Sequence, residues 1–132
     1  MSVYDSLFLL DGLSAEEKEK VISSLSPAVK FSKGELIYSS DSFSRALALI
    51  VSGSAVAVTN NANRVVMKKF SPGMCFGAAA VFGDNSTYVS TVTADSDTEI
   101  QFITEEKLTE FFVSCPKTAV NYITFLSDRI RF

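Results

Sequence analysis

The residues best suited to ligand chemistry lie between Ser71 and Ala94, in the stretch SPGMCFGAAAVFGDNSTYVSTVTA. Pro72-Gly73 predicts a turn, and the small and apolar run from Ala78 to Phe82 predicts a short helix. A polar loop from Gly83 to Ser86 follows, and Thr87 to Thr93 predicts a strand. Such a short helix between two strands leaves its first backbone N–H groups available to a ligand.

Catalytic and metal-binding chemistry is limited by what the sequence lacks. The chain contains no His, which excludes His-ligated haem and Ser-His or Cys-His triads. Cys75 and Cys115 are far apart and show no CxxC spacing, so this chain alone is not expected to hold zinc or an iron–sulfur cluster. An enzyme of cupin-like shape would need His and clustered carboxylates as metal ligands. We therefore predict no enzyme activity, no catalytic residue, no cofactor and no metal site.

The two cysteines allow either a redox role or a structural one. A redox-sensing thiol needs a lowered pKa, and no cationic residue adjoins Cys75 in the sequence to lower it. Cysteine is among the most frequently buried residue types, which favours a small core hydrophobe. Cys115 receives the same interpretation, although its position just before a helix favours the thiolate slightly more.

Composition points to one folded domain without a membrane segment. The chain has 132 residues, 47% of them hydrophobic, which allows a sizeable core and argues against disorder. No apolar run approaches the ~20 residues of a membrane helix, and Asp5 and Asp11 are unlike the start of a signal peptide. We therefore expect a cytoplasmic protein. The net charge of -3 disfavours direct contact with DNA or RNA.

Helix signals occur at both ends of the chain. Val3 to Leu10 predicts a short amphipathic helix, and Ser14 with Glu17 forms the capping-box pattern of a second helix. Thr104 is placed to cap a helix near the C-terminus, and Pro116 is placed to start the last one.

Between these helices the apolar pattern changes to a period of about two, which is typical of strands. Turn signals lie at Lys33-Gly34 and Asn60 to Asn63, and Ser52-Gly53 predicts a tight hairpin turn. The predicted strands are Val29 to Phe31, Leu36 to Tyr38, Ala46 to Val51, Val56 to Val58, Val65 to Phe70, Thr87 to Thr93 and Glu99 to Ile103. Short antiparallel strands at near-regular spacing indicate a sandwich, a barrel or a jelly roll.

An apolar seam runs along the last predicted helix. Its members recur at alternating spacings of four and three residues: Ala119, Ile123, Leu126 and Ile130. This is the spacing of a coiled coil over about two heptads. The seam could pack on the β-structure or form a dimer interface, and its spacing favours the dimer.

Motifs with turn glycines follow one another in a fixed order. Gly34 lies in KGELIY, Gly53 in IVSGSAVAV, and Gly73 and Gly77 in SPGMCFG, after an opening LFLLDGLSAEE. The spacing from Phe76-Gly77 to STVTA is that of a phosphate-binding cassette without a gap. Over nearly its whole length, the chain thus resembles the cyclic-nucleotide-binding domain of Crp/Fnr-type bacterial transcription regulators.

The resemblance implies an α+β, mainly β fold: a double-stranded β-helix (jelly roll or β-roll) flanked by N-terminal helices and a long C-terminal dimerisation helix. It divides the single domain into N-terminal helices over 1–26, a β-roll over 27–103 with the cassette at 71–94, and C-terminal helices over 104–132. It implies an effector-sensing homodimer in which a helix-turn-helix domain contacts DNA. Because the sequence ends inside the C-terminal helix, we expect a sensor domain without that output domain, either excised or a stand-alone relative.

Two charged positions of the family's cassette are neutral here. The Glu that takes the ribose hydroxyl falls at Ala78, and the Arg that pairs with the cyclic phosphate falls at Tyr88, beside Val89. No Lys, Arg or His occurs between Lys69 and Lys107. A buried phosphodiester without a cation would carry a desolvation cost on the order of several kcal/mol. We therefore predict that the chain does not bind cAMP or cGMP.

The remaining cassette residues suit a weakly polar effector of modest size. Arg45 and Arg64 could reach in only from strand or turn edges, where solvation is expected. The candidate ligand-binding residues are Met74, Cys75, Phe76, Gly77, Ala78, Ala79, Tyr88, Val89, Ser90 and Thr91. Small, apolar and aromatic groups with a few hydroxyls fit such a ligand. The alternative is a degenerate cassette, filled by the Tyr88 ring, in a ligand-free dimerisation or protein-interaction module.

Overall fold

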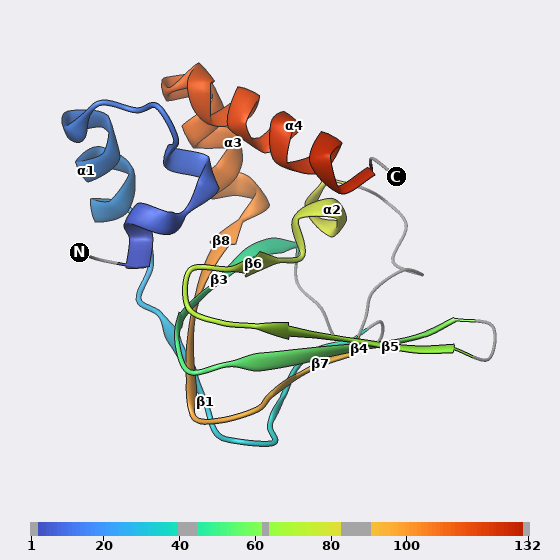
Figure 1. Ribbon diagram of the computed structural model, residues 1–132. Coiled ribbons are helices and arrows are strands. Elements are labelled where there is room, and N and C mark those ends of the chain that lie inside the picture. The colour runs from blue at the N-terminus through green and yellow to red at the C-terminus, as the bar shows by residue number, and fades with distance from the viewer. Residues whose placement is uncertain (1–2, 40–44, 62–63, 83–90, 131–132) are drawn as a thin grey trace.

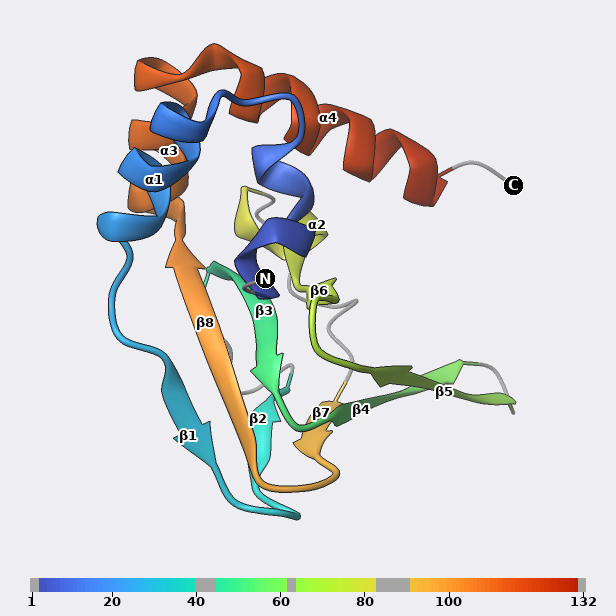
Figure 2. The same ribbon diagram turned by 60° about the vertical axis from the view of Figure 1, so that its left-hand side comes forward.

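The computed structural model describes residues 3–39, 45–61, 64–82 and 91–130 (Figure 1). These residues form two antiparallel four-stranded sheets, with strand orders β1-β8-β3-β6 and β2-β7-β4-β5. The strands are β1 (Val29–Phe31), β2 (Leu36–Tyr38), β3 (Ala46–Ser52), β4 (Ala55–Asn61), β5 (Arg64–Phe70), β6 (Cys75–Phe76), β7 (Thr91–Ala94) and β8 (Thr98–Thr104). The predicted jelly roll is confirmed, with the helices gathered at one end of the sheets (Figure 2).

The chain passes from one sheet to the other at Gly53, where the sequence predicted a hairpin. β3 pairs with β6 and β8, whereas β4 pairs with β5 and β7, so the hairpin prediction is wrong. The Thr98 hydroxyl lies 2.8 Å from the Ser54 carbonyl oxygen and accepts from the Ser54 N–H at 3.2 Å. These contacts hold the β3–β4 crossover directly against the crossover between β7 and β8.

The N-terminal segment contains two 3-10 helices, so the single helix predicted over Val3 to Leu10 is wrong. The two are η1 (Val3–Ser6) and η2 (Phe8–Leu10), and Leu7 between them has φ -70° and ψ 118°. Leu7, Leu9 and Leu10 are all buried. In an α-helix, side chains two residues apart diverge by about 200°. The break at Leu7 therefore allows all three leucines to face the core.

The remaining helix signals of the sequence are confirmed. Ser14 and Glu17 form the capping box, with N···O distances of 3.0 and 3.1 Å, and the Thr104 hydroxyl accepts a hydrogen bond that caps the next helix. Pro116 begins the last helix. The α-helices are α1 (Ala15–Ser23), α2 (Ala78–Val81), α3 (Glu105–Ser114) and α4 (Pro116–Ile130). Within the described residues, none of the helices has the length and apolar character that crossing a membrane requires.

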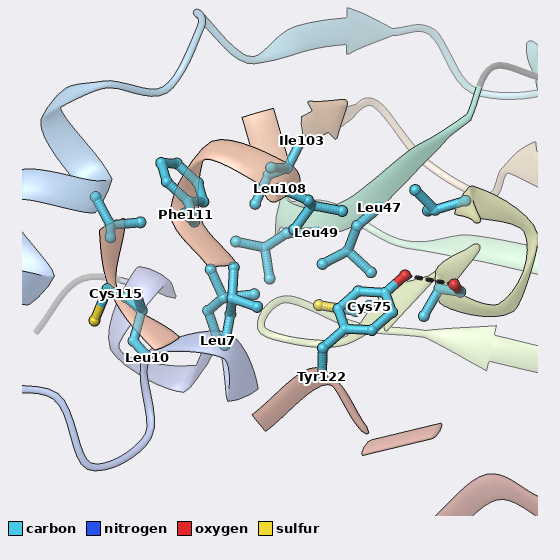
Figure 3. Close-up of a cluster of buried hydrophobic side chains, with 14 of the residues drawn as sticks. Leu7, Leu10, Leu47, Leu49, Cys75, Ile103, Leu108, Phe111, Cys115 and Tyr122 are labelled. Carbon is cyan, nitrogen blue, oxygen red and sulfur yellow. Dashed lines mark hydrogen bonds between the residues drawn. The ribbon is translucent and has the colours of Figure 1, made fainter. Parts of the chain in front are cut away.

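Two apolar clusters form the core, one on each face of β3. Leu47 and Leu49 point toward the helices, whereas Ala48 and Ile50 point between the sheets, as the period of a strand requires. Figure 3 shows the helix-side cluster, which includes Leu108 of α3. The inter-sheet cluster consists of Tyr38, Ala48, Ile50, Ala55, Ala57, Phe70, Phe76, Val92 and Ile100. A ligand between the sheets would meet the second cluster and not the first.

Helix α4 lies across the helical end of the roll and is fixed by the N-terminal segment (Figure 1). The Asn121 amide donates to the Leu9 carbonyl at 2.8 Å and to the Asp11 carbonyl at 2.9 Å. The rings of Phe8 and Phe125 stack with their centroids 3.9 Å apart. These contacts set the orientation of α4 and cover one of its sides.

Candidate functional site

The predicted cassette begins where β6 ends and the chain turns into α2. Gly77 makes this turn with a φ of 84°, and an added Cβ would lie 3.1 Å from the Ala46 carbonyl oxygen. Phe76 pairs with Ala48 of β3 directly before the turn. Glycine is therefore required here both for its left-handed backbone and for the close approach of α2 to β3.

The structure separates the predicted ligand-binding residues into different environments. Phe76 belongs to the inter-sheet cluster, whereas Cys75 and Ala78 are buried in the helix-side cluster. Met74 and Thr91 are exposed. Ala79 lies within α2, and Tyr88, Val89 and Ser90 lie outside the described residues. Among the described members, Phe76 and Gly77 are thus the two placed beside the space between the sheets.

The Phe76 ring lies among aromatic side chains that the sequence did not single out. The Tyr38 ring meets it edge-on with centroids 5.8 Å apart, and the Phe70 ring lies 5.2 Å from it. The Tyr38 hydroxyl lies 3.6 Å from the position that a Cβ on Gly77 would occupy. Burial raises the pKa of Tyr38, so its hydroxyl stays neutral at physiological pH. Tyr38 therefore brings a neutral hydroxyl to the start of the cassette helix.

Small side chains also line this inter-sheet face, together with Ile50, Val92 and Ile100. Ala48 of β3 and Ala55 and Ala57 of β4 are all buried between the sheets. A sequence signal for them exists in the alternation of ALALIV and AVAV, where alanine takes every second position. The alternation predicts that these alanines share a face, but it does not say which face lies inside the roll.

Arg45 lies beside α2, at its C-terminal end. Its Nη1 donates to the Val81 carbonyl oxygen at 3.2 Å, while the residue remains exposed. Val81 belongs to the helix-side cluster, so this hydrogen bond directs the Arg45 guanidinium toward the helical side of the roll. The sequence predicted a solvated side chain, and the structure adds this tether to α2. Within the described residues, no group of three His, Cys, Asp or Glu side chains could hold a metal ion.

Tyr122 of α4 contacts the other end of α2. Its hydroxyl donates to the Ala78 carbonyl, as the dashed line in Figure 3 shows. The Tyr122 ring also meets Phe82, which directly follows α2, with centroids 5.7 Å apart. Burial, and secondarily the electrostatic influence of Cys75, raises the pKa of Tyr122. No local pattern in the sequence indicated this contact, because 44 residues separate its two partners.

Cys115 is one of the residues that line a groove between α1 and α3 with a volume of about 450 Å³. Its Sγ donates to Glu17 Oε2 at 3.2 Å. Burial, and then the adjacent Glu17, raises the pKa of the Cys115 thiol. The backbone N–H of Ser14 is the main cause that lowers the pKa of Glu17. Cys115 is therefore a protonated thiol beside a carboxylate, which favours the structural role over the redox role.

The predicted seam of α4 is partly open to solvent. Ile123 is 63% exposed, and Val120 in the same turn is 51% exposed. Ala119 and Leu126 are half-buried, with Leu126 packed against the helix-side cluster. The Ile130 side chain is outside the described set. The apolar surface that α4 offers to solvent is therefore centred on Val120 and Ile123.

Alkaline pH should destabilise the fold through Tyr122. Its pKa is raised above the ordinary value of 10.0 in the folded chain, so this stabilising contribution is complete below pH 10 and is lost as the pH rises above it. Urea unfolding at pH values from about 8 to about 11, which lie on either side of the ordinary tyrosine pKa, measures the loss of stability. Tyr122→Phe should lose less stability over that range than the unaltered chain. Identical slopes would contradict a buried hydroxyl that donates to Ala78.

Comparisons with known proteins address the family and the fold. Residues 28–115 match the family model of the cyclic nucleotide-binding domain. A search of curated protein sequences finds no match. The Thermus thermophilus catabolite activator protein superposes with a TM-score of 0.83 at 23% identity. That comparison covers 94% of this chain and 58% of the activator, so the chain spans little more than half of that relative.

Two further solved structures cover most of both chains. The N-terminal domain of a transcriptional regulator from Streptomyces coelicolor has a TM-score of 0.76 at 19% identity, covering 96% of this chain and 90% of its own. The sensor domain of the transcriptional regulator DNR from Pseudomonas aeruginosa has a TM-score of 0.75 at 18% identity, covering 97% and 86%. Identities this low show a shared fold.

Proposed function

Because the chain belongs to the cyclic nucleotide-binding domain family, we propose that it is the effector-sensing, dimerising domain of a Crp/Fnr-type transcription regulator. The similar folds of the N-terminal domain of one transcriptional regulator and of the sensor domain of another support this assignment. In this proposal the protein is cytoplasmic, and DNA is contacted by a domain outside these 132 residues. The effector acts by binding two states of the domain with different affinity.

The proposed effector is a weakly polar small molecule and not a cyclic nucleotide. The observation that carries this proposal is the inter-sheet face beside Gly77, where the described side chains are alanines, larger aliphatic groups and aromatic rings, with one neutral hydroxyl on Tyr38. Arg45 supports it, because its guanidinium donates to Val81 on the helix-facing side of β3. A phosphodiester at this face would lack a cation among the described side chains. An aromatic or alicyclic ligand would instead make favourable apolar contacts with those side chains.

The proposed homodimer forms through the exposed side of α4. Val120 and Ile123 give this side an apolar surface that water disfavours, and Ala119 and Leu126 flank it. The seam of Ala119, Ile123, Leu126 and Ile130 keeps its role in this proposal, with Val120 added from the structure. Two copies related by a two-fold axis would bury the same surface twice.

Calorimetry with the purified chain tests the choice of effector. We expect no heat of binding from cAMP or cGMP at concentrations up to about 1 mM, which corresponds to less than about 4 kcal/mol of binding free energy. Indole, phenol and related neutral aromatic compounds, screened first by thermal shift, should include at least one binder. Substituting Tyr38→Phe should weaken that binder, while Tyr4→Phe, outside the inter-sheet cluster, should not. Micromolar binding of cAMP would contradict the proposal.

The second candidate is a ligand-free dimerisation or interaction module. The close ring packing of Tyr38, Phe70 and Phe76 favours it, because these rings already fill space between the sheets. Phe82 does not contribute to that filling, since its ring packs on Phe112 and Tyr122 on the helical side. If no compound of the panel binds and the chain is still a dimer, this module is favoured over the sensor.

A further inference from the structure

The groove between α1 and α3 is separate from the inter-sheet face beside the cassette. The two helices lie side by side in both ribbon views (Figures 1 and 2), and the groove between them has a volume of about 450 Å³. Small-molecule sites typically have volumes of about 300–1,000 Å³. None of the described residues that line the groove belongs to the inter-sheet cluster. An occupant of the groove would therefore be bound independently of a ligand between the sheets.

The lining of the groove combines buried apolar side chains with charged side chains of both signs. Val21 of α1, Phe111 of α3 and Cys115, which directly follows α3, are buried. The charged lining residues are Glu16, Glu17, Lys20, Lys107 and Glu110. A ligand with a single charge would meet like charges as well as opposite ones in this groove. An occupant that fits the whole lining carries an apolar group, a positive charge and a negative charge.

Glu17 presents a fixed carboxylate at the groove. Its Oε1 accepts from the Ser14 N–H at 3.0 Å, and its Oε2 accepts from the Cys115 thiol at 3.2 Å. The Ser14 N–H, followed by the Cys115 thiol, lowers the pKa of Glu17, so the carboxylate is ionised at neutral pH. An ionised carboxylate has about four acceptor positions, so two are left for the ammonium group of a ligand.

Lys20 supplies the matching cation from the same helix. Within the described part of the chain, its ammonium group forms no hydrogen bond or ion pair. Lys107, by contrast, pairs with Glu110 at 3.2 Å along α3. Glu17 and Lys20 are three residues apart, which places their side chains next to each other on one face of α1. A ligand whose two charges are attached to one carbon atom can therefore contact both side chains.

We propose that the groove between α1 and α3 binds a small zwitterion with an apolar side chain, which is the chemistry of a free α-amino acid such as phenylalanine or leucine. The ligand's ammonium group donates to the Glu17 carboxylate, and its carboxylate accepts from the Lys20 ammonium group. Its side chain packs on the apolar lining at Val21 and Phe111. This is a second binding site of the chain, and it does not depend on the effector proposed between the sheets.

Titration of the purified chain with L-phenylalanine, followed by amide correlation NMR, tests the site. The amide signals of α1 and α3 should shift with a Kd on the order of 1 mM, the affinity expected for a ligand of about twelve non-hydrogen atoms. N-Acetyl-L-phenylalanine lacks the ammonium group, and L-phenylalaninamide lacks the carboxylate. Each should bind about fivefold more weakly or worse. Equal binding of the three compounds, or no shift in α1 and α3 at about 10 mM L-phenylalanine, would overturn the proposal.

Substitutions on α1 locate the binding on the protein. Glu17→Gln removes the charge but keeps a side chain that can complete a capping box with Ser14, and Lys20→Met removes the ammonium group. Each should weaken L-phenylalanine binding by about threefold to tenfold. Glu19→Gln and Lys18→Met make the same changes of charge on α1 at positions that do not line the groove, so they should leave the Kd unchanged. Equal effects at the groove and control positions would mean that net charge, and not a site, governs binding.

One more variant separates this site from the proposed sensor function. Tyr38→Phe removes the inter-sheet hydroxyl and should leave the binding of L-phenylalanine unchanged. If Tyr38→Phe weakens the binding while the α1 substitutions do not, the amino acid is bound between the sheets and the groove proposal is wrong. If neutral aromatic compounds fail to bind but L-phenylalanine binding still depends on Glu17 and Lys20, the groove site stands and the weakly polar effector does not.

Discussion

Gly53→Ala should destabilise the chain by about 3 kcal/mol or more, enough to remove much of the stability of an ordinary domain. Gly53 has a φ of 82°, which an alanine adopts only with strain. The added Cβ would lie 2.3 Å from the Asp97 carbonyl oxygen and 2.8 Å from the Thr98 Cα, and neither backbone atom can move freely. The two crossovers between the sheets would be forced apart.

Urea unfolding followed by far-ultraviolet circular dichroism measures this loss. Gly34→Ala is the matched control, because Gly34 has a φ of 86° but no atom within 4 Å of an added Cβ. The control should therefore show the backbone strain alone, about 1–2 kcal/mol. Equal effects at the two glycines would mean that the crossovers do not pack as closely as described.

Ile123→Glu should convert the proposed dimer into a folded monomer. Ile123 is 63% exposed in one chain, so the substitution should change the stability of a single chain by less than about 0.5 kcal/mol. In a two-fold dimer it would place two carboxylates in an apolar interface, at a cost on the order of several kcal/mol per charge. Light scattering after size exclusion should give half the mass of the unaltered chain.

Met67→Glu controls for the general effect of adding charge to an exposed apolar position. Met67 is 67% exposed on β5, which lies away from α4 in both ribbon views (Figures 1 and 2). This variant should remain dimeric. If the unaltered chain is a monomer, or if the dimer persists in Ile123→Glu, α4 is not a dimer interface. The seam is then only a packing surface.

The elements defined by local chemistry were predictable from the sequence. Ser14 and Thr104 cap helices as expected, since a cap is set by residues three positions apart. The strand from Ala46 is buried as its apolar run indicated, and Pro116 starts the last helix. Ala78 and Tyr88 stand at the positions where the family's cassette has Glu and Arg. This loss of charge was also predictable, since it depends only on which residues occur there.

Pairings between distant segments were not predictable in the same way. A tight turn between two alternating strands looks the same whether it joins neighbours in one sheet or crosses between sheets, so Gly53 was misassigned as a hairpin. The 3-10 break at Leu7 depends on the core that three leucines must reach together. Both outcomes follow from burial against segments far away in the chain.

The cassette of 71–94 shows the same division. Its glycine turn, its short helix and its lack of cations come from the sequence, because backbone conformation and residue charge are local properties. The tertiary structure alone placed the Tyr38 hydroxyl near Gly77, sent Cys75 and Ala78 to the helical side, and bonded Tyr122 to Ala78. These contacts join residues that the sequence separates widely, and only the folding of two sheets and a helical layer onto each other brings them together.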